Sequence, residues 1–387
     1  NLIMSLFNKI FIYLRYVRFN NNYFRKKHKN QNGIVLVEFN SFKSFHIAAS
    51  FLINILADKH KSIIKAYPEI NFHQFLDEKN NFFNKLLFYL GKIFKIKNFG
   101  IFDSFGVESF VLITKDNSRE IKATKISNKY LRSIRTKNNL QNFKLQNILI
   151  GDLIYDSYLK YYKKKTIDIN DKNFKFFFRK SIEFYLFWIS YFKDNEIKGV
   201  VAPQSTYMAA LPIRIAASLD ITSLICDAER LYSLKKNKIY SHKEHVNFKY
   251  ILKEKELLKN LKKGRSEAKK RLNLRFSGKV GIDISYLAKS PYAKQKNQKN
   301  FKINQRDRIK ILIAPHSFFD APHSIGNHLF PDYFVWLEYI FKLSKNTNYD
   351  WYVKCHPKFH LEQDPTPSIV NLLCNKYKNV TYLDSSI

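Results

Sequence analysis

Glycine, proline and cysteine are scarce in this chain, whose 387 residues include only 10 glycines, 10 prolines and 3 cysteines. So little glycine and proline excludes collagen-like and proline-rich repeats, and 3 cysteines are too few for a disulfide scaffold. The cysteines also lack the paired spacing of a zinc site, so we expect reduced thiols and a cytoplasmic protein. No run of about 18 uncharged apolar residues occurs, which argues against a transmembrane helix.

Several familiar ligand-binding motifs are missing as well. The chain has no GxxxxGK[ST] phosphate loop, no GxGxxG dinucleotide fingerprint, no HExxH zinc motif and no CxxC pair. Nor do two aspartates stand two residues apart, the arrangement that holds a metal ion on many nucleotide-sugar enzymes. If the chain binds a nucleotide phosphate, then lysine, histidine and helix amino termini must neutralise it. We therefore expect no metal ion and no cofactor.

Acidic residues are few compared with basic ones. The chain has 67 Lys and Arg against 32 Asp and Glu, which gives a formal net charge of +35. Part of this excess accompanies a general abundance of Lys, Asn, Ile, Phe and Tyr, so it identifies a partner only broadly. It favours an anionic partner: a nucleotide, an acidic glycan, a phospholipid headgroup or nucleic acid. The length and the 45% hydrophobic content suggest two domains with large cores.

The amino-terminal segment from Leu2 to Lys27 is both apolar and basic. It is rich in Leu, Ile, Phe and Tyr, but Lys9 and Arg15 interrupt the apolar run and further basic residues follow it. Without a small-residue cleavage site it is a poor signal peptide. Two interpretations are equally good: an amphipathic helix lying on the anionic inner face of the membrane, or a helix packed on its own domain.

The first half of the chain alternates between strand and helix patterns. Gly33 to Phe39 reads as a buried strand, Ser44 to Lys59 as a helix and Ser62 to Tyr67 as a second strand. Further segments follow in the same style, with helices at 72–94, 175–192 and 207–218 and strands at 109–114, 199–202 and 221–226. The stretch from 115 to 147 has no clear pattern. Such alternation predicts a parallel sheet covered by helices on both faces.

A second α/β region follows a polar stretch. Between Ser233 and Gln305 the composition changes to Lys, Asn and Gln, which predicts a helical connector with a flexible tail at 292–304. The predicted fold class is therefore α/β, with two Rossmann-like parallel-sheet domains. Since only three strands follow Ile309, we expect the second domain to be incomplete and the natural protein to continue past Ile387. The predicted parts are a basic amphipathic segment at 1–32, an α/β domain at 33–232, the connector at 233–305 and a second α/β domain at 306–387.

The second α/β region gathers its unusual polar residues where strands end. An apolar strand at 310–314 leads into an irregular loop, a helix follows at 332–343, and a second strand at 349–353 ends at Lys354. In open α/β sheets ligands bind outside the carboxyl ends of strands, so both polar clusters are expected at one crevice. The candidates for binding a phosphate are His316, Ser317, His323, Lys354 and His356, and Asp320 is a candidate for the catalytic base. A loop in which Asp320 forms a turn and Asp332 caps the helix remains the alternative.

The first α/β region offers comparable candidates. Glu38 ends its first strand and His46 lies in the first turn of the following helix, so both are candidates for a catalytic base at an interdomain cleft. Asp152 and Asp156 are four residues apart and share one face if their segment is helical. Each of these two carboxylates is either a base or a solvated helix-capping group.

These residues resemble a known family. The runs Ile311 to His323, Leu329 to Leu337 and Asp350 to Pro357 look like bacterial surface and capsular polysaccharide biosynthesis proteins of the two-Rossmann-domain, GT-B-like glycosyltransferase type. Leu36 to Asn40 and Gly151 to Asp156 are similar to the amino-terminal half of such proteins. In the related sialyltransferases and Kdo transferases a His-Pro pair contacts the phosphate of a CMP-sugar, and the resemblance carries that role onto His356. The acidic-acidic-Gly motif that supplies their base has no clear counterpart here.

The expected function is therefore glycosyl transfer from a nucleotide sugar, such as a CMP-sugar, to a glycan or lipid-linked acceptor. The second α/β domain would bind the donor and the first the acceptor, in the cytoplasm or peripherally on the inner membrane face. One alternative is a glycerol- or ribitol-phosphate transferase of the same architecture. The other is a non-catalytic basic scaffold that binds nucleic acid or membrane. Most aromatic residues sit at core periodicity, so we expect no specific nucleic-acid partner.

Overall fold

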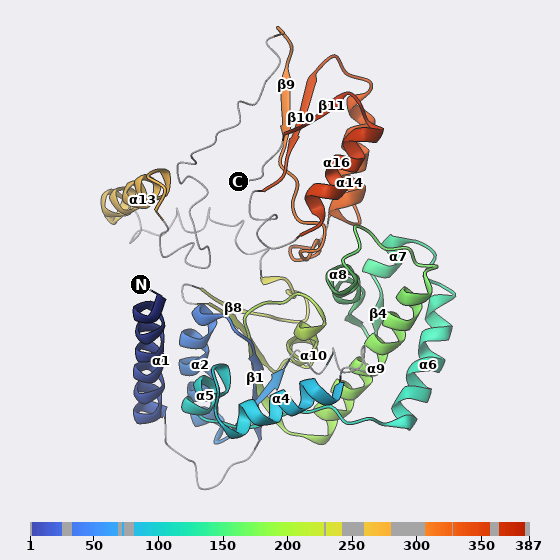
Figure 1. Ribbon diagram of the computed structural model, residues 1–387. Helices are drawn as coiled ribbons and strands as arrows, with labels where there is room; N and C mark the ends of the chain where they lie inside the picture. Colours follow the sequence, from blue (N-terminus) through green and yellow to red (C-terminus); the bar gives the residue numbers. More distant parts are fainter. Residues whose placement is uncertain are drawn as a thin grey trace. The chain divides into compact units, whose positions relative to one another are not determined.

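The computed structural model describes residues 2–24, 33–68, 72, 81–227, 230–241, 259–279, 306–326, 328–356 and 364–383 (Figure 1). The chain divides into two compact units. Unit 1 comprises residues 1–162, 167–241 and 323–328, and unit 2 comprises residues 163–166, 242–322 and 329–387. After its last strand, unit 1 continues to Ser241 and unit 2 begins at His242, within the polar stretch from Ser233 to Gln305.

Unit 1 is built on a six-stranded sheet with the order β3-β2-β1-β6-β7-β8. Its strands are β1 (Ile34–Phe39), β2 (Ile63–Pro68), β3 (Val107–Phe110), β6 (Ile197–Ala202), β7 (Thr222–Cys226) and β8 (Leu231–Ser233). All neighbouring strands run parallel except β7 and β8. The α/β prediction is thus confirmed, but the antiparallel edge strand β8 was not predicted, because three mostly exposed residues carry almost no hydrophobic pattern.

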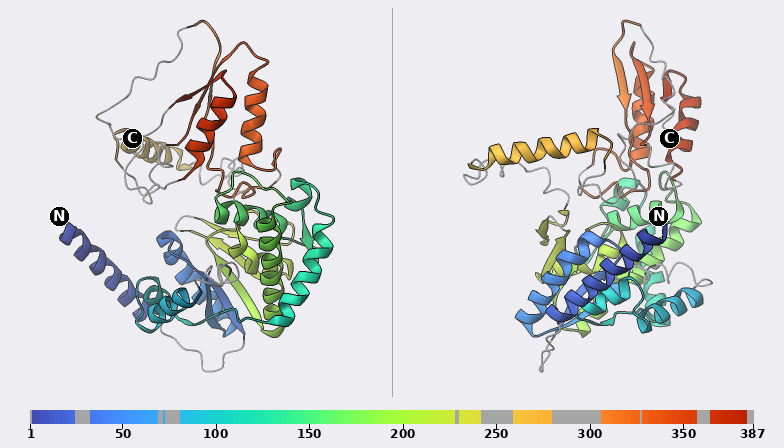
Figure 2. Two further views of the ribbon diagram at one scale, coloured as in Figure 1. Left: turned by 45° about the vertical axis from the view of Figure 1, so that its right-hand side comes forward. Right: turned by 60° about the vertical axis from the view of Figure 1, so that its left-hand side comes forward.

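Helices cover both faces of this sheet. The helices of unit 1 are α1 (Leu2–Phe24), α2 (Lys43–His60), α4 (Asn81–Ile93), α5 (Asn98–Ser104), α6 (Asn117–Leu131), α7 (Lys137–Gln141), α8 (Gly151–Tyr162), α9 (Lys172–Asp194) and α10 (Leu211–Ser218). The unit also contains the 3-10 turn η1 (Met208–Ala210) and the short strand pair β4 (Lys144–Leu145) and β5 (Ile148–Leu149). Figures 1 and 2 show α2 and α5 on one side of the sheet and α8, α9 and α10 on the other. Strand β1 contributes side chains to the hydrophobic cores on both faces of the sheet, since Val35 and Val37 pack toward α2 while Leu36 packs toward α9 and α10.

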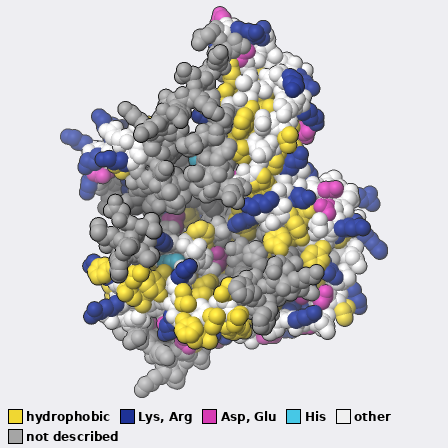
Figure 3. All heavy atoms as spheres, viewed as in Figure 1, with side chains coloured by type: hydrophobic (Ala, Val, Ile, Leu, Met, Phe, Trp, Pro, Cys, Tyr) yellow, Lys and Arg dark blue, Asp and Glu magenta, His cyan; other side chains and the backbone are white. Residues whose placement is uncertain are grey.

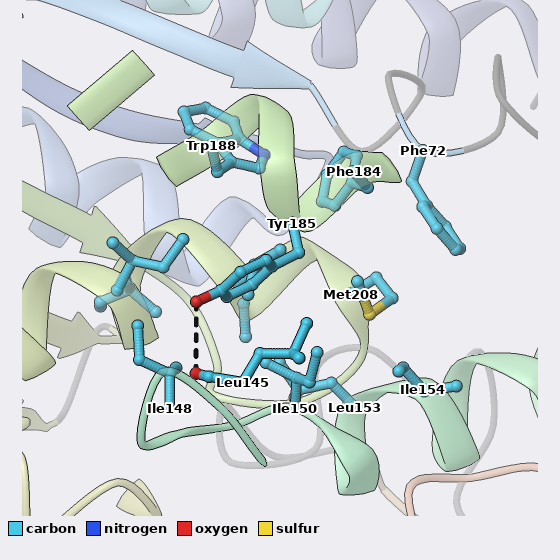
Figure 4. Packing of buried hydrophobic residues seen from close by; sticks show 14 of the residues in the cluster. Phe72, Leu145, Ile148, Ile150, Leu153, Ile154, Phe184, Tyr185, Trp188 and Met208 are labelled. Carbon is cyan, nitrogen blue, oxygen red and sulfur yellow. Dashed lines mark hydrogen bonds between the residues drawn. The ribbon is translucent and has the colours of Figure 1, made fainter. Parts of the chain in front are cut away.

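The larger core lies between the sheet and α8, α9 and α10. Aromatic side chains of α9 dominate it, and Trp188 packs edge-on against Tyr67 of β2 with ring centroids 5.4 Å apart. Tyr185 is buried in the same core and satisfies its hydroxyl by donating to the carbonyl of Leu145, 3.2 Å away (Figure 4). Burying aromatic rings on this scale stabilises the layer that positions α8.

Unit 2 contains a smaller sheet of three parallel strands in the order β11-β10-β9. The strands are β9 (Lys310–Ile313), β10 (Asp350–Lys354) and β11 (Val380–Leu383), and the helices are α13 (Leu261–Phe276), α14 (Tyr333–Ser344) and α16 (Thr366–Lys376). Phe334, Leu337 and Phe341 of α14 pack on Val353 of the central strand. Helix α13 has no buried residue, which agrees with its polar composition.

Some predicted boundaries shift in the structure. Strand β3 occupies 107–110 rather than 109–114, because its pairing with β2 begins at Val107 and ends at Phe110. The unassigned stretch 115–147 forms α6, α7 and β4. In the predicted helix 72–94 the structure describes α4, while most of 72–80 and the predicted tail at 292–304 lie outside the described residues. Within the described part of the chain, no helix has the length and apolar character needed to cross a membrane.

Candidate functional site

The polar residues of unit 2 follow two neighbouring strand ends. Strand β10 lies between β9 and β11, and its Val353 is paired with Ile313, the last residue of β9. Lys354, the last residue of β10, therefore lies beside the start of the loop at Ala314. Lys354 is half-buried and His356 is exposed, whereas Cys355 between them is buried in the core. This end of the strand thus carries a partly exposed lysine and an exposed histidine.

The loop after β9 adds a second imidazole to this end of the unit. The side chains of His316 and Asp320 are 52% and 64% exposed, and the distance between Nε2 of His316 and Oδ2 of Asp320 is 3.9 Å. The His316 ring also packs on Tyr333, with centroids 4.9 Å apart. Both groups are therefore accessible to a ligand.

Ser317 has a structural role in the same loop. Its hydroxyl donates to Oδ2 of Asp364 at 2.5 Å, and the neighbouring backbone N–H of Phe318 donates to Oγ1 of Thr366 at 3.2 Å. These two bonds fix the loop to the amino terminus of α16. Ser317 is buried, so the structure gives it a partner within the protein.

Asp332 caps helix α14. Its Oδ1 accepts a hydrogen bond from the backbone N–H of Val335 at 2.8 Å, and its Oδ2 accepts one from Thr166 at 2.5 Å. The capping interpretation of Asp332 is therefore confirmed.

In unit 1 the strand order reverses between β1 and β6. The chain builds β1, β2 and β3 outward in one direction and then β6 and β7 in the other. Ligands of doubly wound sheets bind at the carboxyl ends of the strands where the order reverses. Glu38 and Asn40 end β1 at this point, and Ser205 and Thr206 follow the end of β6. Sequence analysis identified Glu38 but missed the residues after β6.

Buried polar atoms without partners accompany this reversal point. Glu38 is paired in register with Tyr67 of β2, and both are almost completely buried. Within the described part of the chain, the Tyr67 hydroxyl and Thr206 Oγ1 are buried without a hydrogen-bond partner. Since a buried polar group without a partner is costly, these two hydroxyls suit a polar ligand. Burial, and then the charge of Glu38, raise the pKa of Tyr67 well above its ordinary value, so the phenol stays protonated.

His46 is positioned less favourably for catalysis. It is buried, its ring packs edge-on against Phe102, and its Nε2–H donates to the carbonyl of Asn40 at 3.0 Å. Burial lowers the pKa of His46, and the ammonium of Lys43 lowers it further against the effect of the Asn40 bond. His46 is therefore a buried, neutral imidazole whose Nε2–H is already used, and its role is to order the turn between β1 and α2.

Helix α8 carries Asp152 and Asp156 on one face, as their spacing predicts. Neither is solvated, because every residue from Gly151 to Leu159 is buried. Oδ1 of Asp152 lies 2.6 Å from Nη1 of Arg214, and the Tyr240 hydroxyl donates to Oδ2 at 3.0 Å. Arg214 also donates to the carbonyls of Leu149 and Ser205, so its charge is fully paired and hydrogen-bonded.

Asp156 binds His323 through two atoms of that residue. Oδ1 of Asp156 is 2.6 Å from Nδ1 of His323, and Oδ2 accepts from the His323 backbone N–H at 3.2 Å. Nε2 of His323 lies 3.1 Å from Oε1 of Gln141. Burial raises the pKa of Asp156, while His323 opposes that rise. Both ring nitrogens of His323 are therefore engaged inside unit 1, which points to a structural role.

Sequence reasoning found the two aspartates of this network but missed Arg214, Tyr240 and Gln141. A single arginine inside the apolar helix Leu211–Ser218 was the available signal, because a buried guanidinium requires a carboxylate partner.

Among the described residues, no group of three or more His, Cys, Asp or Glu side chains is placed to hold a metal ion. Comparisons of the chain with protein-family models, with curated proteins and with solved structures give no match.

Proposed function

We propose that this chain is a glycosyltransferase with a nucleotide-sugar donor and a glycan or lipid-linked acceptor, acting in surface or capsular polysaccharide biosynthesis. The observation that carries the proposal is the pairing of Val353 with Ile313, which brings Lys354 and the loop after β9 to one edge of a parallel sheet. Edges of this kind bind nucleotides in doubly wound folds. The two α/β units correspond to the donor and acceptor domains of a GT-B-like enzyme.

Unit 2 supplies the donor site in this proposal. Lys354, His356 and His316 offer one ammonium and two accessible imidazoles to a diphosphate or monophosphate. Charge-assisted hydrogen bonds from such groups are stronger than neutral ones. The phosphate is thereby neutralised by side chains, and no metal ion is needed in the proposed reaction.

Unit 1 supplies the acceptor site. Inverting transfer needs a base that takes the proton of the acceptor hydroxyl. Glu38 is the preferred base because it lies where the strand order reverses and is paired with Tyr67, whose hydroxyl has no partner among the described residues. Asp320 in unit 2 is the second candidate. His46 is the weakest of the three, since its Nε2–H already donates to Asn40.

The thiols are compatible with the proposed cytoplasmic location. The three cysteines are buried and unpaired. Burial raises the pKa of Cys226 and of Cys355 to about 12, and that of Cys374 to about 11. They stay as neutral core thiols, as expected of a protein in a reducing compartment that also contains nucleotide sugars.

A thermal-shift screen tests the proposal. A ligand that binds only the native state raises the apparent stability, by about 2.7 kcal/mol at a hundred times its Kd. We expect one class among CMP-, UDP- and GDP-sugars to raise the melting temperature, and cleavage of that donor to accelerate when a glycan acceptor is added. Stabilisation by a CDP-polyol alone would instead identify a polyol-phosphate transferase.

The non-catalytic scaffold makes the opposite prediction. Such a protein would be indifferent to every nucleotide sugar and would bind nucleic acid with an affinity that falls steeply with salt. That pair of results would overturn the glycosyltransferase proposal.

A further inference from the structure

Unit 1 carries an unusual number of exposed apolar side chains on α1, α2 and α4. Ile12 of α1 is 66% exposed, and Phe94, just after α4, is 67% exposed. Phe11, Ile55, Leu87 and Ile93 are exposed as well. Figure 3 shows hydrophobic side chains gathered on the part of unit 1 where these helices lie. We call the exposed side chains of these three helices and of residues 94–96 the apolar surface.

Contacts inside unit 1 join these helices into one surface. The Tyr13 hydroxyl of α1 donates to the carbonyl of Lys95 at 3.2 Å, so Ile12 and Phe94 each lie next to a residue of this bond. Tyr23 of α1 packs edge-on against Phe51 of α2, with centroids 5.7 Å apart. Contiguous exposed apolar area of this kind usually marks an interaction site.

The other side of α1 is anchored to the unit. Asn20 is buried and donates to the Ser104 hydroxyl of α5 at 3.1 Å, and Phe24 belongs to the core beneath α2. The outer residues of α1 can therefore contact a partner while the helix stays attached.

The same helices carry few acidic residues: α1 and α4 have none, and α2 has only Asp58, near its C-terminal end. The first carboxylate of the chain is Glu38, and residues 42–57 and 81–102 include no Asp or Glu. Arg15 and Arg18 on α1 and Lys92 on α4 are exposed. The apolar surface is thus basic as well as apolar, since its basic residues outnumber the single carboxylate of these helices, Asp58.

We propose that the apolar surface docks on an anionic lipid bilayer, with its apolar side chains entering the headgroup region and its basic residues near lipid phosphates. Burial of apolar area and attraction to anionic lipid reinforce one another in interfacial helices. Sequence analysis gave Leu2 to Lys27 two equally good interpretations, membrane docking and packing on its own domain, and the present proposal extends the docking surface to α2 and α4. The proposal is independent of the glycosyltransferase activity.

Charge and chemistry distinguish this partner from two others. A second copy of the chain docked through the same surface would bring basic residues against basic residues, since an isologous interface uses one patch twice. Nucleic acid would pair with Arg15 and Lys92 but would leave the exposed aliphatic side chains without an apolar partner. An anionic bilayer satisfies both kinds of residue.

Vesicle flotation of the full chain tests the proposal. We expect binding to vesicles of phosphatidylcholine with 30% phosphatidylglycerol, weak binding to pure phosphatidylcholine, and weaker binding at 500 mM than at 100 mM salt, because salt screens the charge contribution. The double substitution Ile93→Ser/Phe94→Ser should lower the partition coefficient at least tenfold. Arg15→Glu/Arg18→Glu should lower it similarly for the anionic vesicles.

Leu272→Ser/Leu372→Ser is the matched control, because it removes two exposed apolar side chains from α13 and α16 in unit 2. It should bind vesicles as the unaltered chain does, and all variants should keep its circular dichroism spectrum. Equal binding by the Ile93→Ser/Phe94→Ser variant would overturn the proposal. So would concentration-dependent dimerisation that this variant abolishes, combined with no vesicle binding by the unaltered chain.

Discussion

Asp156 and His323 are 167 residues apart in the sequence, yet Oδ1 of Asp156 lies 2.6 Å from Nδ1 of His323. The amide of Gln141 is oriented by its donation from Nε2 to Oδ1 of Asn138 at 2.7 Å. The Oε1 atom of Gln141 therefore faces His323 and accepts a hydrogen bond from Nε2 of the His323 ring. Through this pair, residues 323–328 belong to unit 1 although the chain on either side of them belongs to unit 2.

Replacing His323 with Ala should destabilise unit 1. The change leaves the buried carboxylate of Asp156 without its imidazole partner, and breaking a buried pair in this way costs about 3 kcal/mol or more. Urea denaturation followed by circular dichroism measures the loss. The double variant Asp156→Asn/His323→Ala should recover part of it, because a neutral amide costs less to bury alone.

His328→Ala is the control for this prediction. Its ring centroid lies 6.3 Å from that of His323, and its buried Nε2 has no hydrogen-bond partner among the described residues. We expect its replacement to cost about 1 kcal/mol or less. Equal losses for the two histidines would contradict the role given to the Asp156 contact.

Gly326 offers a second test of how residues 323–328 are held. Its φ is +71°, and a Cβ built on it would lie 2.5 Å from Cε2 of Tyr240, the residue whose hydroxyl binds Asp152. Gly326→Ala should therefore lower the free energy of unfolding by about 1–3 kcal/mol, from backbone strain and overpacking.

Gly264 on helix α13 is the matched control. A Cβ added there would meet no atom within 4 Å, so Gly264→Ala should stabilise the helix by up to about 1 kcal/mol through its better helix propensity. The two alanine substitutions should thus change stability in opposite directions in urea denaturation. A stabilising Gly326→Ala would show that the Tyr240 side chain moves aside without cost.

His46 should make stability depend on pH. Its folded pKa is lowered from the ordinary value of 6.5, chiefly by burial. A group with a depressed folded pKa contributes stability that is complete above its unfolded pKa and is lost as pH falls through the folded pKa. The unaltered chain should therefore lose stability below about pH 6.5, by up to about 1.4 kcal/mol for each unit of pKa shift.

His46→Gln keeps a donor for the Asn40 carbonyl but does not titrate. The difference in free energy of unfolding between the unaltered chain and this variant should favour the unaltered chain less as the solution is acidified from pH 7.5 to 5. Other histidines titrate in both proteins, so their effects cancel in the difference. A difference that stays constant with pH would mean that His46 is protonated as readily as in the unfolded chain.

Local pattern was sufficient to predict the parallel sheet of unit 1. Buried parallel strands are short apolar runs, and Gly33 to Phe39 and Gly199 to Ala202 follow that pattern, with Glu38 as the exception. Strand β8 was missed because it is an exposed edge strand, held by pairing Tyr232 with Ile225 rather than by burial. Helix α6 was missed because its surface is polar, although Asp116 caps it by accepting from the N–H of Arg119.

The candidate sites were only half predictable for a related reason. Spacing alone places Asp152 and Asp156 on one face of α8, since residues four apart share a helix face. Their partners Arg214, Tyr240 and His323 come from segments that only the tertiary fold brings to α8. Periodicity predicts on which face of its own helix or strand a residue lies. The contact between Asp156 and His323, 167 residues apart, depends instead on how several elements pack together.

Replacing His356 with Ala should weaken donor binding without unfolding unit 2. The side chain is exposed, so its loss removes little core packing. If it donates to a donor phosphate, the lost charge-assisted bond should raise the donor Kd about tenfold or more, measured by isothermal titration with the nucleotide sugar selected in the thermal-shift screen. An unchanged Kd would remove His356 from the proposed donor site.

Replacing Lys354 with Ala should also weaken donor binding, and the loss should depend on salt. Lys354 is the last residue of β10, at the carboxyl end of the strands where the phosphate is proposed to bind, whereas Lys310 is the first residue of β9, at the amino end of the same parallel sheet. Both substitutions remove one positive charge from unit 2, so a general effect of net charge would act equally on both. A local contact predicts instead that only Lys354→Ala raises the donor Kd, several-fold at 20 mM salt and less at 300 mM, because ions screen a partly exposed charge. Equal effects of Lys354→Ala and Lys310→Ala at both salt concentrations would show that the carboxyl edge of this sheet has no special affinity for the donor.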